Sequence, residues 1–367
     1  MKQIILAQPV INIKDTSKIF NSVLKSNFVN EGKQTKEFEE KICKLLKVKY
    51  AVSTTSGTVA LFLALKASGI KNGDEVIIPN ITFPATANAV EMAGGKIILA
   101  DVNPSNLLID EQSLKRNINR KTKFVIPVHI SGRGNNISKI VNICKKKSIK
   151  VVEDAAESLG SKIKNRSLGS FGVAGCFSFA PNKIITSGQG GIVVTNNKNI
   201  YKKIKRFKDQ GRVGPTTGGE DKYVSVGYNF KFTNLQSALA LSQLKSIKWR
   251  IRKLKEIYKF YIKNIKQNKK LIIIKFNLKN GELPLWVDIW CKNRNKLFNF
   301  LKKKNIICRY YWKPINTCKP YLTSFKNLPN SKKLQNKMMW LPSSLDMSFK
   351  QQKKVCDMIN LFYSRKK

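Results

Sequence analysis

Short apolar runs rich in β-branched residues alternate with segments of helical periodicity from residue 35 to residue 210. This alternation is typical of βαβ units, in which parallel strands lie side by side under covering helices. We therefore expect seven strands in one large, mostly parallel sheet, with helices between them that include 58–67 and 137–147. The expected strands are Tyr50–Val52, Val76–Ile78, Ile97–Leu99, Phe124–Val128, Val151–Val152, Gly175–Phe179 and Ile192–Val194.

An apolar stripe with helical spacing begins after Asn234 and continues to Tyr258, which predicts one long helix that connects two domains. The chain after Tyr258 shows strand patterns at 271–274 and 285–289 and helical patterns at 292–303 and 349–362. We expect a large α/β domain over residues 1–245, whose first residues would be able to pack with the smaller domain. The connecting helix and a small C-terminal α+β domain would occupy residues 246–367.

The net charge of +47 arises from 69 Lys and Arg residues against 22 Asp and Glu residues, an excess that often indicates nucleic-acid binding. The lysines are instead spread over every helical stretch, as expected of solvated surface positions. Clusters such as Lys145–Lys147 lack the interleaved aromatic residues of a single-strand binding platform. We expect no nucleic-acid partner and keep that function as a minority alternative, while the positive field would attract an anionic diphosphate substrate.

The seven cysteines include no C-x-x-C pair, so neither a disulfide framework nor a zinc site is indicated. A single histidine argues against most multi-histidine metal sites. No apolar run reaches the roughly 18 residues that a membrane-spanning helix requires. These features predict a cytoplasmic protein with reduced thiols, no metal and no membrane partner.

Two segments place chemically active side chains just after apolar strands. The run 151–158 ends on carboxylates, and Asp154 stands where ligands bind in an open α/β sheet, although a helix cap would use the same residue. Lys183 follows the run 175–179 and precedes Gly188, Gly190 and Gly191. Those glycines allow close approach of the backbone to a ligand, and a simple hairpin turn is the alternative.

Two further segments carry polar or aromatic residues where a strand runs into a helix. Ser56, Gly57 and Thr58 open a helix, and free N–H groups at such an end bind phosphate. An ordinary Ser/Thr cap would give the same local pattern. Phe83 lies at the second junction, within 80–89, where an aromatic ring either packs in the core or stacks on a ligand.

In this order and spacing, the four segments resemble the DegT/DnrJ/EryC1/StrS family of sugar aminotransferases, and the resemblance covers nearly the whole chain. Further matching segments are 30–39, 127–129, 227–231 and 341–342. The resemblance implies a fold-type-I, aspartate-aminotransferase-like architecture and pyridoxal 5'-phosphate as cofactor, with pyridoxamine phosphate as its alternate form. It also implies glutamate and a nucleotide diphosphate keto-sugar as substrates, and a homodimer with shared active sites.

The resemblance assigns roles to matching residues. Lys183 would bind the cofactor covalently and shuttle a proton. Asp154 would pair with the ring nitrogen, Phe83 would stack on the ring, and Glu157 would contact the phenolic oxygen. The phosphate would be held by Ser56, Gly57, Thr58 and Ser178, and Asn229 would reach the phosphate of the neighbouring subunit.

Two positions depart from the usual family pattern. Glu157 replaces a common Gln, a change that occurs in sugar 4-aminotransferase branches, and Gln189 replaces a common Glu in the glycine-rich turn. Some relatives that act as dehydratases carry His at the position of Lys183. This chain keeps the lysine, so transamination is favoured over the two alternatives, a dehydratase and a non-catalytic regulatory relative.

The segments 153–158 and 56–61 favour a perosamine-synthase-like enzyme that acts at C4 of a 4-keto-6-deoxy sugar for surface polysaccharide or glycan biosynthesis. Lys33, Arg212 and Lys313 are candidate diphosphate ligands, although solvated surface charge is the simpler interpretation of each. His129 is expected to be structural or substrate-lining rather than a catalytic acid–base group.

Overall fold

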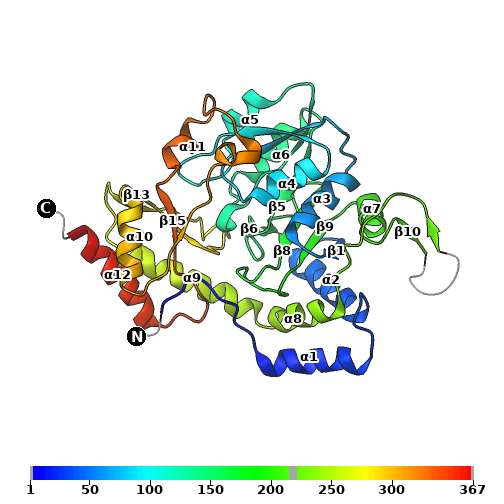
Figure 1. Ribbon diagram of the computed structural model, residues 1–367, viewed down its shortest axis with the longest axis horizontal. Helices are drawn as coiled ribbons and strands as arrows, with labels where there is room; N and C mark the ends of the chain where they lie inside the picture. The colour runs from blue at the N-terminus through cyan, green and yellow to red at the C-terminus, as the bar shows by residue number, and fades with distance from the viewer. Residues whose placement is uncertain (1–2, 215–220, 365–367) are drawn as a thin grey trace.

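A computed structural model describes residues 3–214 and 221–364 (Figure 1). Its large sheet has seven strands in the order β1-β9-β8-β5-β4-β2-β3, and each strand overlaps with an expected segment. Strand β9 is antiparallel to both of its neighbours, whereas the other pairs are parallel. The strands are β1 (Tyr50–Thr54), β2 (Glu75–Pro79), β3 (Lys96–Ala100), β4 (Thr122–Val125), β5 (Lys150–Asp154), β8 (Ala174–Ser178) and β9 (Gly191–Thr195).

Helices cover both faces of this sheet because apolar side chains point from the strands to either side. One face packs against α3, α4 and α7. The other face packs against α5 and α6 near β4 and against α2 and α8 near β9. These helices are α2 (Lys33–Leu46), α3 (Gly57–Ala67), α4 (Pro84–Met92), α5 (Glu111–Asn117), α6 (Ile137–Lys145), α7 (Lys198–Lys208) and α8 (Asn234–Leu244).

The expected strand Phe124–Val128 is too long, because regular pairing ends at Val125. Pro127 has no N–H group to donate to a neighbouring strand, so the ladder cannot continue through it. The chain stays extended, and the Pro127 carbonyl accepts a hydrogen bond from the N–H of Asp154. The following residue, Val128, forms an isolated bridge with Asp154.

The predicted single helix from Asn234 to Tyr258 is wrong, because the structure divides it into α8 and α9 (Ile247–Asn264). Ser246 lies at the break with φ −99° and ψ 11°, outside the helical region. Its hydroxyl donates to the carbonyl of Gln243 at 3.0 Å and also accepts from Arg250 Nε at 2.9 Å. A serine side chain that bonds to the local backbone competes with helix continuation.

A second, four-stranded antiparallel sheet has the order β12-β13-β15-β14. Its apolar face packs against α9, α10 and α12 in a separate cluster of buried residues, which fits the α+β character expected for the C-terminal part. The exact domain boundary at 245/246 stays a prediction. The elements are β12 (Leu271–Ile273), β13 (Val287–Cys291), α10 (Arg294–Lys303), β14 (Arg309–Tyr310), β15 (Met338–Leu341) and α12 (Phe349–Ser364).

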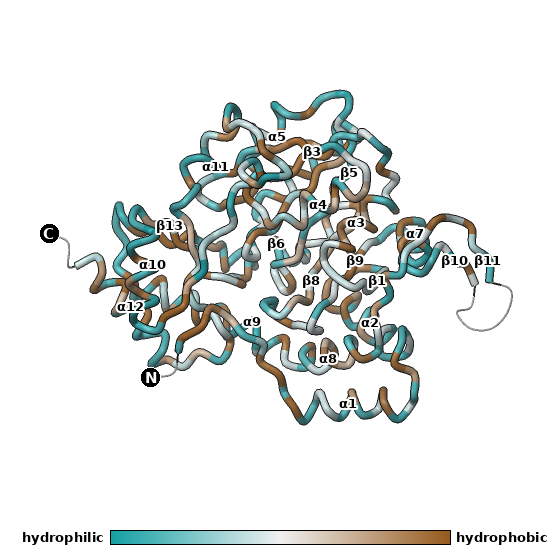
Figure 2. The backbone as a smooth tube through the Cα atoms, viewed as in Figure 1, coloured by the Kyte–Doolittle hydropathy of each residue, from teal (hydrophilic) through white to brown (hydrophobic). Residues whose placement is uncertain are grey.

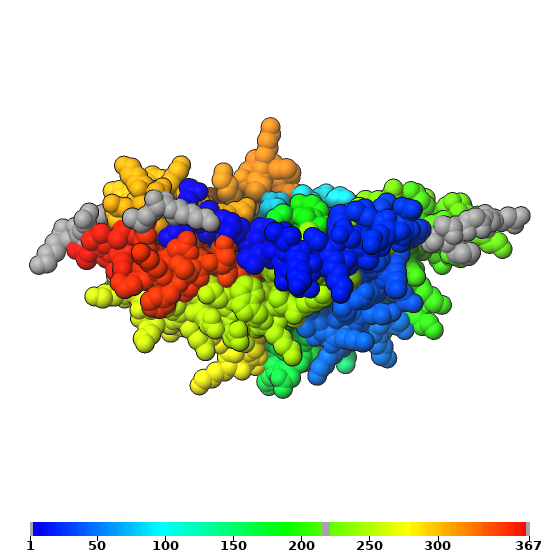
Figure 3. Space-filling view, turned by 90° about the horizontal axis from the view of Figure 1, so that it is seen from below, coloured from blue at the N-terminus to red at the C-terminus, as the bar shows by residue number. Residues whose placement is uncertain are grey.

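The N-terminal segment spans the two sheet systems. Ile4 bridges to Ile306, the carbonyl of Leu6 accepts from Ser343 N–H at 2.7 Å, and Val10 accepts from Arg250. The chain then enters α1 (Ile13–Lys25), which packs against α8. Figure 3 shows this blue segment crossing one face of the molecule beside the red C-terminal helix.

Part of the C-terminal region also lies on the large sheet. The side chains of Asn316 and Asn80 bond to each other, and Asp101 accepts from Asn330 N–H and Ser331 N–H at the start of α11 (Pro329–Leu334). Two short antiparallel ribbons lie outside the two larger sheets. In one, β6 (Lys162–Ile163) pairs with β7 (Arg166–Ser167), and in the other, β10 (Arg212–Val213) pairs with β11 (Lys222–Tyr223) on an arm that projects from the body (Figure 1).

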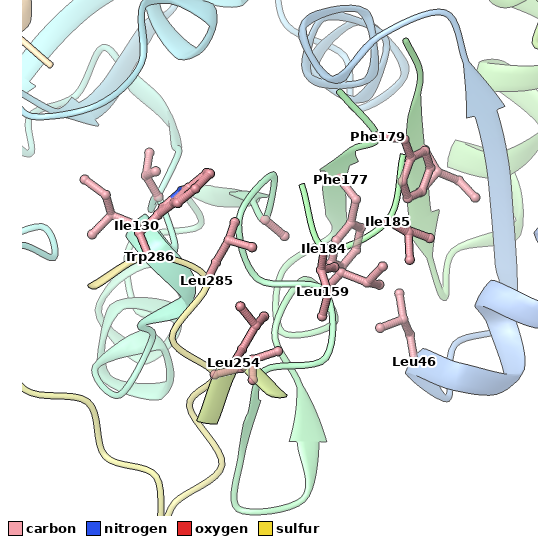
Figure 4. Packing of buried hydrophobic residues seen from close by; sticks show 14 of the residues in the cluster. Leu46, Ile130, Leu159, Phe177, Phe179, Ile184, Ile185, Leu254, Leu285 and Trp286 are labelled. Carbon is pink, nitrogen blue, oxygen red and sulfur yellow. The ribbon is translucent and has the colours of Figure 1, made fainter. Parts of the chain in front are cut away.

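Hydrophobic residues gather inside the molecule and hydrophilic residues on its outer helices and loops, as Figure 2 shows. The largest cluster continues from the large sheet toward α9, with Phe177 and Ile184 on one side of the view and Leu254 and Trp286 on the other (Figure 4). Among the helices of the described ranges, none combines the length and the apolar character needed to cross a bilayer.

Candidate active site

A cavity of about 210 Å³ lies where β5 and β8 end, at the junction of the two sheet systems. A larger groove of about 1770 Å³ follows β12 elsewhere, and none of the expected site residues lines it. The smaller cavity is therefore the candidate active site on chemical grounds. Its lining includes eight of the nine residues expected to form the site: Ser56, Gly57, Thr58, Phe83, Asp154, Glu157, Ser178 and Lys183.

Lys183 lies in the loop between β8 and β9, in a turn where its N–H donates to the carbonyl of Ala180 at 3.0 Å. The side chain is 12% exposed, and Nζ donates to Glu157 Oε1 at 3.1 Å. A lysine amine that faces an enclosed cavity and is fixed by one carboxylate can bind a carbonyl compound covalently. The geometry fits the role expected of Lys183.

Glu157 accepts hydrogen bonds from three different donors. Oε1 accepts from Lys183 Nζ and from the indole N–H of Trp286, each at 3.1 Å, and Oε2 accepts from the N–H of Ser131 at 2.8 Å. A glutamine has one accepting oxygen, so its NH₂ group would face a donor on one side. The three donors explain why a carboxylate, and not the amide common in the family, suits this position.

Asp154 ends β5 and is buried, with 5% of the residue exposed. Oδ2 accepts from the hydroxyl of Thr86 at 2.7 Å, and Oδ1 accepts from the N–H of Ala156 at 3.2 Å. Burial raises the pKa of Asp154, and these two hydrogen bonds and the charge of Lys183 oppose that shift. A protonated ring nitrogen in the cavity would give this carboxylate a positive partner.

The start of α3 forms a cradle that fits a phosphate group. The hydroxyl of Ser56 caps the helix by accepting from Val59 N–H at 3.2 Å, and the first N–H groups of a helix lack intrahelical partners. A Cβ added at Gly57 would lie 2.9 Å from Ser178 Cβ. A Cβ added at Gly191 would lie 2.3 Å from the Ser56 carbonyl oxygen, so this turn requires glycine.

Phe83 precedes α4 and is 50% exposed at the cavity wall, unlike a core residue. Its ring lies 5.7 Å from that of Trp312, at an angle of 52°. A ring that is exposed on a ligand cavity can stack on a planar aromatic group. The position therefore favours the stacking role over the core role that the sequence left open.

Several lining residues were missed by the sequence reasoning. Trp286, Trp312, Trp340 and Arg309 come from the C-terminal part of the chain, and no local pattern marks them as site residues. The guanidinium of Arg309 lies 5.8 Å above the Trp340 ring, which places a cation at the wall. Thr86, which bonds to Asp154, lies three residues after Phe83, and helical spacing alone could have indicated it.

Asn229 does not line this cavity. It is exposed, and it forms an isolated bridge with Asp209 on the segment that returns from the projecting arm. Within one protomer, Asn229 therefore lies outside the cavity of its own chain. The expected contribution to a neighbouring subunit stays a prediction.

The remaining candidates lie away from the cavity. His129 is buried and bonds to Glu153 at 2.7 Å, which favours a structural role over substrate contact. Arg212 pairs with Asp209 and Asp221, so its charge is already engaged within the protomer. Lys33 and Lys313 are exposed and absent from the lining.

The family comparison agrees with this geometry. The family model described as the DegT/DnrJ/EryC1/StrS aminotransferase family matches residues 11–360. The chain belongs to this family. The expected fold class, the enzyme class of aminotransferase and the cofactor pyridoxal phosphate are thereby confirmed.

Individual relatives show how far the likeness extends. A GDP-perosamine synthase of Escherichia coli O157:H7 is 34% identical over 371 residues, which covers 100% of both chains. The structure of PseC from Helicobacter pylori, an aminotransferase involved in the biosynthesis of pseudoaminic acid, has 27% identity and a TM-score of 0.92 over 99% of this chain and 100% of that one. A sugar aminotransferase of Streptococcus pneumoniae in its PLP-form shares the fold, with 22% identity and a TM-score of 0.93 over 99% of each chain.

Proposed function

We propose that this aminotransferase transfers an amino group from glutamate to C4 of a nucleotide-linked 4-keto-6-deoxy sugar, for the synthesis of a surface polysaccharide or other glycan. The observation that carries the proposal is the single cavity that gathers the amine of Lys183, the buried carboxylate of Asp154 and the N-terminus of α3. The substrate class is supported by the full-length likeness to a GDP-perosamine synthase.

The side chains divide the work of the reaction. Pyridoxal phosphate supplies an electron sink that stabilises negative charge on the substrate carbon. Lys183 Nζ would hold the cofactor and carry a proton at the substrate carbon. Asp154 would stabilise positive charge on the ring nitrogen and Phe83 would cover the ring face, while Glu157 fixes the amine of Lys183.

The charges around the cavity suit two anionic substrates. Among the lining residues that the structure describes, Lys183 and Arg309 are the Lys and Arg side chains. Arginine binds carboxylates through a planar, bidentate fork, so Arg309 is a candidate anchor for the glutamate carboxylate. The net charge of +47 would attract the diphosphate of the sugar nucleotide.

A homodimer with shared active sites is part of the proposal. Tyr223, Val224 and Val226 on the projecting arm are 61%, 54% and 82% exposed, an unusual concentration of apolar surface on a single segment. A second copy of the chain would cover this surface and bring Asn229 toward the partner's cradle at α3. We place the enzyme in the cytoplasm, where nucleotide sugars are available and its seven thiols stay reduced.

The direct test follows isotopically labelled nitrogen from glutamate into the sugar. The purified enzyme would be incubated with pyridoxal phosphate, labelled glutamate and a panel of GDP-, UDP- and dTDP-linked 4-keto-6-deoxy sugars, with 3-keto sugars for comparison. Mass spectrometry should detect labelled 4-amino product with at least one 4-keto substrate. The Lys183→Ala variant should form none, because it cannot bind the cofactor covalently.

The same product masses separate the alternatives. A dehydratase would give a sugar that has lost oxygen and gained no label, and a regulatory relative would leave every sugar unchanged. Turnover restricted to the 3-keto sugars would contradict the assignment to C4 while leaving the aminotransferase class intact.

A further inference from the structure

A chain of two threonine hydroxyls lies behind the carboxylate of Asp154. Thr86 Oγ1 is 2.7 Å from Asp154 Oδ2, and Thr82 Oγ1 is 2.8 Å from Thr86 Oγ1. Both threonines are buried, with exposures of 0% for Thr86 and 1% for Thr82. Thr82 and Asp154 both line the cavity, so the chain of hydrogen bonds runs along the cavity wall through the fully buried Thr86.

The number of protons fixes the direction of these bonds. A hydroxyl has one hydrogen to donate, and an ionised carboxylate can only accept. When Asp154 is ionised, Thr86 must donate to it, so Thr86 accepts from Thr82. Hydrogen bonds arranged in such a series strengthen one another and favour negative charge at the accepting end.

The start of α4 holds this arrangement in place. Phe83 is the N-cap, Pro84 begins the helix, and the N–H of Thr86 donates to the carbonyl of Phe83 at 3.2 Å. The fixed φ angle of proline suits the first helical position, and the β-branched side chain of threonine restricts rotation about χ1. One turn of helix therefore sets both the ring that faces the cavity and the hydroxyl that faces Asp154.

The charges around Asp154 show what the hydroxyl opposes. Burial raises the pKa of this carboxyl group, and the nearby charge of Glu157 raises it further. The hydrogen bond from Thr86 is the strongest opposing influence, ahead of the Ala156 N–H and the charge of Lys183. Removal of the hydroxyl would therefore favour the neutral acid, which pairs poorly with a protonated ring nitrogen.

We propose that Thr86, supported by Thr82, is a positioning residue that keeps the carboxylate of Asp154 ionised and aimed at the ring nitrogen of the cofactor. The inference rests on the proposed role of Asp154 and adds two residues to the machinery of cofactor activation. The proposed role affects cofactor binding and the charge of Asp154, so cofactor affinity tests it without any measurement of turnover.

The test compares two ligands that differ at one atom. Pyridoxal phosphate and its 1-deaza analogue, which lacks the ring nitrogen, would be titrated into the apo protein, and binding would be followed by quenching of tryptophan fluorescence, since Trp286, Trp312 and Trp340 line the cavity. Thr86→Val should bind pyridoxal phosphate on the order of tenfold more weakly, the usual scale for losing a hydrogen bond to a charged group. Its affinity for the analogue should match that of the wild type.

Three further variants separate the hydroxyl from the packing. Thr86→Ser retains the hydroxyl and should restore most of the affinity, whereas Thr82→Val should cause a smaller loss than Thr86→Val. Thr195→Val is the matched control. Thr195 is also buried, and its hydroxyl donates to the carbonyl of Val173 at the end of β9 that lies away from the cavity. This control should bind both ligands like the wild type.

Either of two results would overturn the inference. Equal weakening of both ligands in Thr86→Val, or equal losses in Thr86→Ser and Thr86→Val, would mean that the side chain only fills space. Asp154→Asn is the reference that tests the underlying assignment, and it should weaken pyridoxal phosphate but spare the analogue. A failure of that reference would remove the proposed pairing of Asp154 itself, a different outcome from a failure of Thr86 alone.

Discussion

Two buried carboxylates in one cavity wall are held in opposite ways. Glu157 receives three N–H donors from Lys183, Trp286 and Ser131, which together surround both of its oxygens. Asp154 receives one N–H and one hydroxyl, and a hydroxyl can turn to accept a hydrogen bond. An amide substitution should therefore be tolerated at the aspartate and resisted at the glutamate.

Asp154→Asn should stabilise the cofactor-free protein by about 1 kcal/mol at neutral pH, the scale of an incompletely compensated buried polar group. Burial raises the pKa of Asp154 in the folded protein, so ionisation of this carboxyl destabilises the fold. This loss of stability is absent below the pKa of an unfolded Asp, grows as the pH rises toward the raised folded-state pKa, and is complete above it. The advantage of the variant should disappear in acid, where both side chains are neutral. Thermal unfolding of the apo proteins across pH measures this, and a less stable variant at neutral pH would contradict it.

Glu157→Gln should destabilise the cofactor-free protein by about 1–3 kcal/mol, although glutamine is the common family residue here. The amide NH₂ group would face either the N–H of Ser131 or the donors Lys183 and Trp286, which leaves buried donors without acceptors. Urea unfolding of the apo protein gives the free energy of unfolding. Equal stability of Glu157→Gln and the wild type would show that the donors rearrange freely.

At this scale the sequence is informative where a chemically active residue stands at the end of an apolar strand or shortly after it. Asp154, Phe83 and Lys183 could be chosen because each follows an apolar strand that ends at the same edge of the sheet. Trp286 and Arg309 could not be chosen, because they reach the cavity from strands that the chain forms more than a hundred residues later. Their positions depend on how the two sheets pack, which no local pattern records.

At the scale of elements, apolar runs with β-branched residues locate all seven strands of the large sheet, because burial on both faces demands a continuous apolar pattern. The break between α8 and α9 was missed because the apolar stripe continues through it. The decisive groups are polar: the hydroxyl of Ser246 and the side chain of Gln243, which bonds to both backbone groups of Thr186. Periodicity does not report such contacts.

A buried ion pair joins the large sheet to the small one. Arg133 directly follows the short helical turn Ile130–Gly132, which comes after β4. Its guanidinium pairs with Asp288 on β13, and both side chains are 0% exposed. The same guanidinium donates to the carbonyls of Ile274 and Lys275, and Asp288 also accepts from Trp340. Removal of one partner would leave the other charge buried without its counterion.

Asp288→Ala should therefore lower the free energy of unfolding by about 3–5 kcal/mol, the usual penalty for breaking a buried pair. The double variant Arg133→Met with Asp288→Leu should lose less than the single one, because neither charge remains to be desolvated. The exposed pair of Lys41 and Glu37 supplies the control, and Glu37→Ala should cost about 0.5 kcal/mol or less. Denaturant unfolding compares all four proteins, and a loss at Asp288 no larger than at Glu37 would contradict the role of the pair.

At the scale of the whole molecule, one protomer leaves the expected site incomplete. The cradle at α3 lies on the cavity, whereas Asn229 lies outside it beside the arm that projects from the body (Figure 1). A two-fold axis would exchange the arms of two protomers, since each patch in such a dimer meets the same patch of the partner. The proposed homodimer therefore makes a claim about which chain supplies each residue of one site.

Mixed dimers test that claim directly. Lys183→Ala and Asn229→Ala proteins, each weak or inactive alone, would be unfolded together and refolded, or co-expressed with different affinity tags. If Asn229 acts across the interface, a mixed dimer contains one site with a wild-type lysine from one chain and a wild-type asparagine from the other. Random reassortment should then restore about a quarter of the wild-type activity, because half of the dimers are mixed and each has one intact site.

The alternative geometry gives a different number from the same mixture. If Asn229 served the cavity of its own chain, every site in a mixed dimer would carry one substitution, and the mixture would show no gain over its parent proteins. Light scattering of the purified mixed species confirms the dimer and excludes aggregation as the cause of a missing gain. Recovery of activity thus requires both the association of two chains and the exchange of Asn229 between them, which ties the exposed arm to the chemistry at Lys183.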